Sequence, residues 1–369
     1  MGDAGDLIVF GIVVALRLGI PLLIPRFPLP AVITCLILDG VDQTIFQNFT
    51  DLDLTGYQSY DKALDIYYLT VAYLSTFRSW DNFAAFEMSR FLYYFRLAGV
   101  ALFEITHTRA LLLFFPNTFE YFFIFYEAVR LRWNPVRMSA TLVVLAAGAI
   151  WVFIKVPQEY WIHIAQLDVT DELEAHPAAV PILAVAIVAL LAVAWWLIMY
   201  RCPPADHKLS FVVDDPFGEE AYRRMGQQVS EQGVFNLALV EKLVMVSLVN
   251  FIFSQILPNL SASTLQLTVG IGILIVANTV ISEWLARRGV GWDSTIREFG
   301  AMLLVNLGIA VVFRLVLPET DGSIRIGNTL FFLFIVTLLV TLHDRYRPFH
   351  LLRQEQLAKA IVGTKTEGV

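Results

Sequence analysis

Residues 141–154 read TLVVLAAGAIWVFI, a stretch without a single charged side chain. Similar runs recur from end to end of the 369-residue chain and approach 20 residues, which is long enough to cross about 30 Å of hydrocarbon. Because lipid offers no partners to backbone polar groups, only helices or closed barrels span a membrane. Barrel strands alternate apolar and polar residues, and this run does not. The sequence therefore predicts an all-α, polytopic integral membrane protein.

The composition supports this class and excludes others. Hydrophobic residues make up 57% of the chain and charged residues only 16%, whereas soluble domains carry about 25% charge. The net charge of −7 arises mainly from acidic loops. Basic stripes interleaved with aromatic residues are missing from the sequence, so no nucleic-acid partner is expected. The two cysteines have no metal-ligand spacing.

Apolar runs bounded by charge, Pro or Gly predict about eleven transmembrane helices, within a range of 9–11. The expected spans are residues 7–24, 28–49, 63–77, 84–104, 109–129, 138–156, 178–200, 237–257, 264–284, 299–317 and 327–343. Lys and Arg concentrate in alternate loops, and the positive-inside rule then places the N-terminus outside and the C-terminus inside. The acidic N-terminus MGDAGD lacks the basic region of a cleaved signal peptide, so the first span is expected to remain.

The two halves of the chain differ in charge, which suggests a division of labour. Residues 1–157 form a charge-rich and aromatic transmembrane half, which is expected to hold any intramembrane site. Residues 158–177 are expected to form an extracytoplasmic acidic loop. Residues 178–343 form a plainer hydrophobic half with a cytoplasmic loop at 201–236, and residues 344–369 form a basic cytoplasmic tail along the inner leaflet.

Four aspartates are the leading site candidates. Asp39 and Asp42 are three residues apart and Asp61 and Asp65 four apart, so each pair shares one face of a helix. The predicted topology places all four toward the extracytoplasmic side, where they could bind a cation or protons. Carboxylate oxygens also suit a divalent cation such as Mg²⁺, Mn²⁺ or Ca²⁺. The alternative is that these acids are simply solvated at the outer interface.

The same residues resemble the motif of the CDP-alcohol phosphotransferases. Asp39, Asp42, Gly56, Asp61 and Asp65 stand at nearly the spacing of that motif. Gln43 replaces a glycine, Phe46-Gln47 replaces Ala-Arg, and one extra residue separates Gly56 from Asp61. The resemblance covers about 27 residues and implies a divalent metal and a lipid-linked phosphate substrate. That family works at the cytoplasmic face, opposite to the side predicted here.

Further ionisable residues lie in or beside the apolar runs. Glu104 and His107 could relay a proton near neutral pH, or could stabilise a turn together with Arg109. Glu120 has no partner within its own helix, so it needs one elsewhere or must be protonated, and it is a candidate proton carrier. Two further pairs are expected to be neutralised within their helices, Glu87 with Arg90 and Glu127 with Arg130. His163 and Asp168 belong to the expected outer loop and could add to a metal site, or be solvated.

Three functions remain open. The first is a transporter or channel-like protein with an intramembrane cation or proton site. The second is a metal-dependent membrane enzyme acting on a lipid or lipid-linked phosphate. The third is an accessory subunit whose buried charges only fix helix packing. The protein is expected in the cell membrane, which it crosses several times. A small ion or a lipid-linked substrate is the expected ligand, and the sequence is compatible with oligomers.

Overall fold

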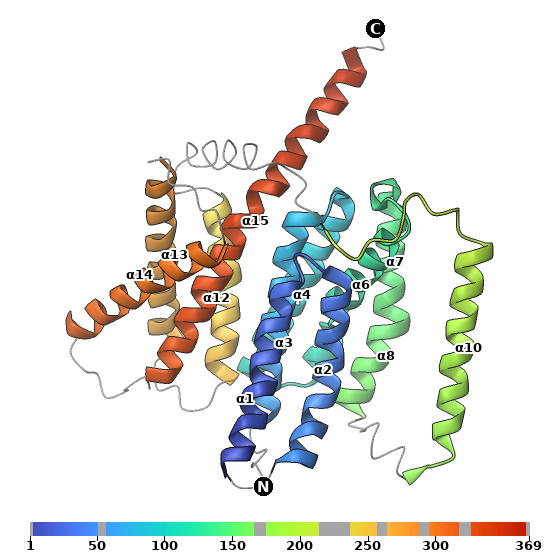
Figure 1. Cartoon of the computed structure of the whole chain (residues 1–369), viewed down its shortest axis with the longest axis horizontal. Helices are drawn as coiled ribbons and strands as arrows, with labels where there is room; N and C mark the ends of the chain where they lie inside the picture. Colours follow the sequence, from blue (N-terminus) through green and yellow to red (C-terminus); the bar gives the residue numbers. More distant parts are fainter. Residues whose placement is uncertain are drawn as a thin grey trace.

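The computed structural model describes residues 3–50, 57–165, 175–213, 237–256, 264–287, 295–316 and 326–366. All regular elements in these ranges are helices, which confirms the all-α prediction for this part of the chain (Figure 1). In chain order they are α1 (Asp3–Gly19), η1 (Ile20–Leu23), α2 (Pro28–Phe49), α3 (Tyr57–Ser79), α4 (Phe83–Thr106), α5 (Ala110–Phe114), α6 (Thr118–Arg130), η2 (Pro135–Arg137), α7 (Ala140–Ile150), η3 (Trp151–Lys155), α8 (Val156–Glu159), η4 (Tyr160–Ile164), α10 (Ala179–Tyr200), α12 (Leu237–Ile256), α13 (Thr264–Arg287), α14 (Thr295–Val316) and α15 (Ile326–Thr366).

Helix boundaries follow from local start signals in the sequence. α2 begins at Pro28, a residue that suits the first helical turn because the N–H groups there have no partner within the helix. Asn82 caps α4 by accepting a hydrogen bond from the backbone N–H of Ala85, and Ser139 caps α7 in the same way. Each apolar range expected from the sequence coincides with helical structure.

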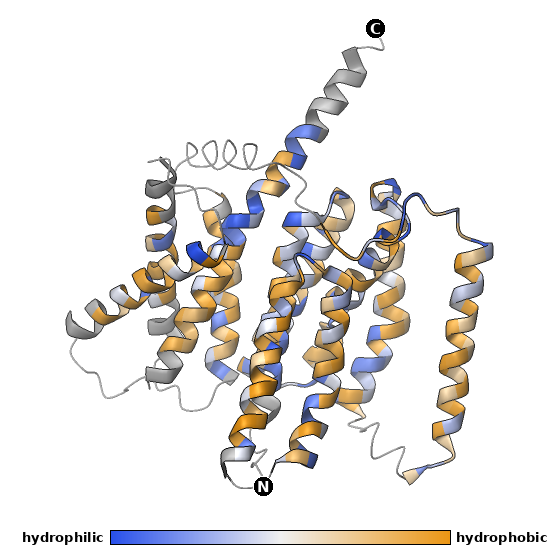
Figure 2. Cartoon of the chain, in the orientation of Figure 1, coloured by the Kyte–Doolittle hydropathy of each residue, from blue (hydrophilic) through white to orange (hydrophobic). Residues whose placement is uncertain are grey.

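Four segments are long and apolar enough to cross a membrane: Gly5–Leu23, Pro28–Phe49, Ala140–Ile164 and Ala179–Tyr200. These helices indicate a membrane protein. Length and composition single out these four among the described residues, and the count of about eleven spans and their orientation stay predictions. α10 is the most apolar of the four. It is wholly exposed and stands apart from the other helices, and its surface therefore suits contact with lipid (Figures 1 and 2).

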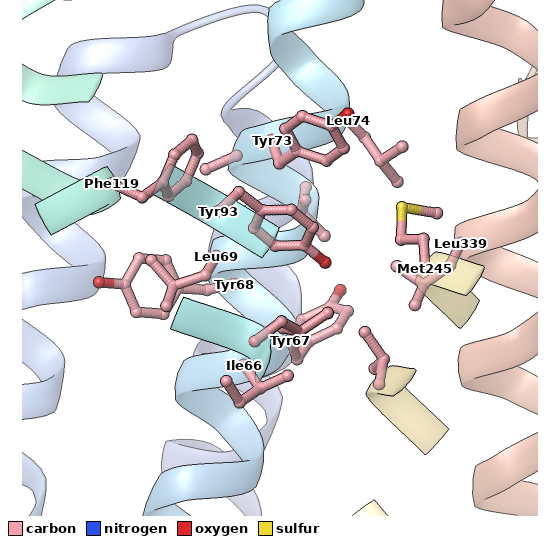
Figure 3. Packing of buried hydrophobic residues seen from close by; sticks show 14 of the residues in the cluster. Ile66, Tyr67, Tyr68, Leu69, Tyr73, Leu74, Tyr93, Phe119, Met245 and Leu339 are labelled. Carbon is pink, nitrogen blue, oxygen red and sulfur yellow. The ribbon is translucent and has the colours of Figure 1, made fainter. Parts of the chain in front are cut away.

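α3 lies at the centre of the bundle and packs against α1, α2, α4, α12 and α15. Its core is aromatic: Tyr73 stacks on Tyr93 of α4 with ring centroids 4.3 Å apart. Phe119 of α6 lies on one side of this pair, and Met245 and Leu339 lie on the other (Figure 3). The aromatic runs of the N-terminal third therefore pack largely inside the protein, where large rings bury the most apolar area.

Two predicted spans are irregular helices. The fifth is broken at Pro116 into α5 and α6, as the proline suggests. The sixth continues beyond its expected end at residue 156 through η3, α8 and η4 to Ile164, so the outer loop begins later than predicted. Pro157 lacks an N–H, and the π-helical segments η3 and η4 on either side allow the helix to continue past it.

The connections 25–27, 78–82, 131–138 and 201–213 meet at one end of the bundle, which we call the basic end. Arg78 donates to the carbonyls of Pro25 and Val213, and the Val213 N–H donates to the Arg26 carbonyl. Asn82 donates to the carbonyls of Pro135 and Met138. These contacts fix the loops that connect the N-terminal helices.

α15 continues far beyond the span expected at 327–343. It is one helix to Thr366, and its polar part passes beyond the other helices (Figure 2). Arg353 is buried, donates to the carbonyls of Phe77 and Arg78 at the end of α3, and pairs with Asp81 at 2.6 Å. The first part of the expected tail is therefore a helix packed on α3 and not a segment lying on a leaflet.

Candidate functional site

The four predicted aspartates come together around one arginine. Nη1 of Arg17 lies 2.9 Å from Asp39 Oδ1 and 2.6 Å from Asp42 Oδ2. Nη2 of Arg17 lies 3.1 Å from Oδ1 of both Asp61 and Asp65. We call these five residues the Arg17 cluster. The prediction of a shared acidic site thus finds a geometric basis, while the arginine at its centre was not anticipated as its partner.

Helix geometry and two neighbouring contacts position this cluster. Asp39 and Asp42 share one face of α2, and Asp61 and Asp65 share one face of α3. Beyond Arg17 toward the end of α1, the Leu18 carbonyl accepts a hydrogen bond from Tyr67 at 2.9 Å. In the middle of α1, on the other side of Arg17, the rings of Phe10 and Phe46 lie 5.8 Å apart. α1 is thereby held against α3 and α2 on both sides of Arg17.

The cluster lies at mid-length of α2. Asp39 is eleven residues from the first residue of α2 and ten from the last, roughly 15–16 Å from each end. If α2 crosses the bilayer squarely, the carboxylates lie close to the membrane centre, where an ionised group is most costly.

Burial within the cluster is uneven. The side chains of Arg17 and Asp42 are 4% and 0% exposed, whereas those of Asp39, Asp61 and Asp65 are 31%, 30% and 34% exposed. Asp39 Oδ1 is ion-paired with Arg17 but accepts no hydrogen bond. Three carboxylates therefore form an accessible face, and Arg17 with Asp42 forms its buried floor.

The carboxylates repel one another when all are ionised. Oxygen atoms of Asp39, Asp61 and Asp65 lie within 4.8 Å of one another, and two ionised carboxylates have no donor between them. Four ionised aspartates and one guanidinium would leave three negative charges, which gives the cluster room for protons or for a cation.

The donor set also fits a metal ion in type. One carboxylate oxygen from each of Asp39, Asp61 and Asp65 lies within 4.8 Å of the other two. Mg²⁺ and Ca²⁺ prefer such oxygens, although each needs about six or more ligands. Arg17 contacts the same three residues, so a bound divalent ion would compete with the guanidinium for them.

Glu120 has a partner from a distant helix. Its Oε2 lies 3.4 Å from Nζ of Lys155 in η3 and accepts a hydrogen bond from the Asn117 side chain at 3.1 Å. Both Glu120 and Lys155 are buried. Lys155 also lies 3.9 Å from the centroid of the Tyr121 ring. The expectation that Glu120 needs a partner outside its own helix is met by a lysine 35 residues away in sequence.

Glu104 and His107 do not form the predicted pair. Glu104 is buried and lies 3.7 Å from Lys62, whereas His107 is exposed and caps the end of α4 with a positive φ of 54°. The left-handed turn at His107 directs the chain away from the helix, which separates the two side chains. The turn-stabilising alternative therefore describes His107 better than a proton relay does.

Two expected intrahelical pairs are present. Glu87 lies 3.8 Å from Arg90, and Glu127 lies 2.7 Å from Arg130. Each has an additional partner that the sequence did not indicate: Arg90 lies 3.4 Å from Glu241 of α12, and Glu127 accepts a hydrogen bond from Trp80.

The C-terminal half is less plain than expected. Lys242 is buried, pairs with Asp344 at 2.5 Å and donates to Thr279. Asn306 accepts from Asn278 at 2.9 Å and donates to Thr337 at 2.7 Å, which links α13, α14 and α15. In the sequence, these contacts were indicated only by the presence of polar residues within apolar runs. Hydropathy alone does not show which helices they join.

Two loop residues named above, Gly56 and Asp168, lie outside the described residues. His163, from the same predicted loop as Asp168, lies in η4 and is 3.0 Å from Glu159.

The fold and the site define an all-helical chain with membrane-type apolar helices and a buried arginine ringed by four carboxylates. Comparison with protein-family models, curated proteins and solved structures finds no match to this chain. The resemblance of residues 39–65 to the CDP-alcohol phosphotransferase motif is thus not accompanied by a family match.

Proposed function

We propose that the Arg17 cluster exchanges protons for a cation within the membrane and that this chain is a transporter or channel-like protein. The observation that carries this proposal is the charge imbalance of one guanidinium among four carboxylates. Among the described contacts of the cluster, full ionisation leaves three uncompensated charges, which would cost about 8–10 kcal/mol on the mildest insertion scale if the cluster lies at the bilayer centre. A cost of that size is comparable to the whole stability of a protein, so protons or a cation must neutralise the cluster.

The accessible face supplies the second part of the argument. Asp39, Asp61 and Asp65 are each partly exposed, and one carboxylate oxygen of each lies within 4.8 Å of the other two. A cation that reaches this face would replace protons as the neutralising charge. Arg17 stays charged at all physiological pH values and therefore sets a fixed background against which the exchange occurs.

Cation binding coupled to proton release tests this proposal in the purified protein. Na⁺, K⁺, Mg²⁺, Mn²⁺ and Ca²⁺ are added separately, and released protons are measured with a pH-sensitive dye while binding is measured by calorimetry. We expect at least one of these cations to bind and release protons, and Asp65→Asn to lose both signals. Glu87→Gln is the matched control, because Glu87 is 58% exposed and lies outside the cluster. Unchanged binding and proton release in both Asp39→Asn and Asp65→Asn would overturn the proposal.

Transport itself needs a flux measurement. The purified protein is reconstituted into liposomes, and flux of the cation that binds is followed under an imposed pH gradient. We expect flux in the wild type and in Glu87→Gln, and its loss in Asp65→Asn. Binding without flux in the wild type would show a cation site in a protein that is not a transporter.

The second candidate is a metal-dependent enzyme acting on a lipid-linked phosphate. The three carboxylate oxygens within 4.8 Å of one another favour it. It would require Mg²⁺ or Mn²⁺ to bind the aspartates in place of Arg17 and to polarise a phosphate. Turnover of a lipid-linked phosphate that is abolished by chelation and restored by Mg²⁺ would support this alternative over transport.

For the topology we propose eleven membrane crossings, with the N-terminus outside and the basic end in the cytoplasm. The four connections of the basic end hold Arg26, Arg78, Arg132, Arg137 and Arg201, which agrees with the positive-inside rule. Cys202 is exposed in this region while Cys35 is buried. A membrane-impermeant maleimide should label Cys202 only from the cytoplasmic side, and Cys202→Ser should abolish the signal. Labelling from outside in intact cells would reverse the topology.

A further inference from the structure

A second buried network of charges lies beside the Arg17 cluster. Glu159 of α8 accepts a hydrogen bond from the backbone N–H of Asn117 at 3.0 Å and lies 3.0 Å from Nε2 of His163. The side chain of the same Asn117 donates to Glu120, which pairs with Lys155. Asn117 therefore joins the two carboxylates, and the contacts run without interruption from His163 to Glu120.

The helix that carries this network provides a path from one end of the bundle to its middle. Lys155, Glu159 and His163 follow one another at four-residue intervals, the spacing of one helix face. The side chain of His163 is 22% exposed, whereas those of Glu159 and Lys155 are 6% and 4% exposed. Glu120 lies ten residues before the end of α6, roughly 15 Å from the basic end, which matches the depth of Asp39 in α2.

The network is balanced in charge, unlike the Arg17 cluster. Glu120 and Glu159 are opposed by Lys155 and by Arg96, whose Nη1 lies 3.9 Å from Glu159. Nε of Arg96, Oδ1 of Asn117 and Oγ1 of Thr118 are buried without a hydrogen-bond partner in the structure. Buried polar atoms normally have partners, so these three atoms mark a place that suits water.

The two networks lie on neighbouring helices. α2 and α6 pack against each other, and Asp39 and Glu120 lie at similar depths in them. The charged and titratable groups around Glu120 are Lys155, Glu159, Asp39 and Tyr121, from η3, α8, α2 and α6. The Arg17 cluster needs protons, and the balanced network leads from it to a partly exposed histidine.

We propose that His163, Glu159, Lys155 and Glu120 form a proton relay between the end of the bundle opposite the basic end and the Arg17 cluster. This inference rests on the proposed exchange of protons at that cluster. It assigns to Glu120 the proton-carrying role expected from its place in the sequence. It adds Lys155 and Glu159, which the sequence did not indicate, and gives His163 a role other than the expected metal ligand.

Each step of the relay conserves charge and protons. The Lys155 ammonium gives a proton to Glu120, 3.4 Å away, and Glu120 passes it through a bridging water to Asp39. His163 gives a proton to Glu159, 3.0 Å away, and Glu159 returns it to the Lys155 amine through a second bridging water. His163 is reprotonated from the aqueous side. One proton enters at His163 and one arrives at Asp39, and every relay group returns to its starting state.

The relay predicts that binding and proton supply separate in mutants. Glu120→Gln should retain equilibrium binding of Mn²⁺, or of whichever tested cation binds the wild type, but should slow cation flux driven by a pH gradient at least tenfold. The flux that remains should lose the pH dependence of the wild type. Glu127→Gln is the matched control, because Glu127 lies on the same helix, is equally buried and belongs to a different ion pair.

Further variants keep the test decisive. Glu120→Gln leaves Lys155 unpaired, so Glu120→Gln/Lys155→Gln, which removes both charges, is measured if the single variant does not fold. His163→Asn should slow proton-driven flux and be rescued in part by imidazole. Flux in these variants equal to that in Glu127→Gln would overturn the relay. Loss of cation binding in Asp65→Asn tests the site itself, so the relay can fail while the proposed function stands.

Discussion

Replacing Arg17 with Leu removes the guanidinium that pairs with all four aspartates of the cluster. Arg17 is 4% exposed and makes four ion pairs of 2.6–3.1 Å, so its removal leaves buried like charges facing one another. Removing one partner of a buried ion pair costs about 3–5 kcal/mol. We expect Arg17→Leu to lose that much unfolding free energy near neutral pH. Acid protonates the carboxylates and reduces their repulsion, so the loss should shrink at low pH.

A surface pair supplies the comparison for this experiment. Arg137 lies 2.6 Å from Asp206, but its side chain is 73% exposed. Exposed pairs contribute about 0.2–1 kcal/mol, so Arg137→Leu should cost little despite the equal distance. Equilibrium unfolding in mixed micelles, followed by tryptophan fluorescence, measures both variants. The double variant Arg17→Leu/Asp42→Asn should recover part of the loss. A cost for Arg17→Leu no greater than that for Arg137→Leu would refute the reasoning.

Three further predictions concern packing, pH and polar contacts between helices. A methyl group at Gly99 would overlap the Phe115 side chain, so Gly99→Ala should lower the free energy of unfolding by about 1–3 kcal/mol. Gly148 has open space around it, so Gly148→Ala should be neutral or stabilising in the same unfolding assay. Burial and the nearby charges of Arg353, Arg347 and Arg90 lower the pKa of His350 from 6.5 to about 4. As the pH drops through this interval, the unfolded chain binds a proton before the folded protein does, so the free energy of unfolding should fall. His350→Phe should remove this part of the pH dependence. Asn306→Leu should cost about 0.6–1.7 kcal/mol by thermal unfolding because it removes the hydrogen bonds of Asn306 with Asn278 and Thr337. Thr106→Val at an exposed site should cost less.

The positions of the helices could be predicted because apolar length and Pro, Gly or charge at the boundaries encode them locally. α2 occupies residues 28–49 as expected, since Pro28 starts it. The grouping of Asp39 with Asp42 and of Asp61 with Asp65 also follows from helical spacing. The span containing Lys155 was expected to end at residue 156 because Pro157 suggests a stop. Two π-helical segments continue the helix past this proline.

Partners across helices could not be predicted, because hydropathy does not determine which faces meet. Arg17 is 25 residues from Asp42 and 48 from Asp65, and Lys155 is 35 from Glu120. Those contacts depend on the rotation and depth of each helix in the bundle. For the same reason, the sequence did not show which residues pair with Glu241 and Lys242, although both form ion pairs between helices.

The accessory-subunit hypothesis predicts that buried charges pair completely, and three networks allow a comparison. Around Glu159, two acids face two bases, and Lys242 pairs one to one with Asp344. Such balance is what helix packing requires, because an uncompensated charge in a low-dielectric interior is costly. The Arg17 cluster departs from it by placing four carboxylates on one guanidinium, three of them partly exposed. Asn in place of Asp39 or Asp65 removes repulsion while keeping a polar side chain. A cluster that served only helix packing would therefore be better built with Asn at these positions. If these two variants are more stable than the wild type and fail to bind cations, the excess of acids is maintained for binding and not for folding.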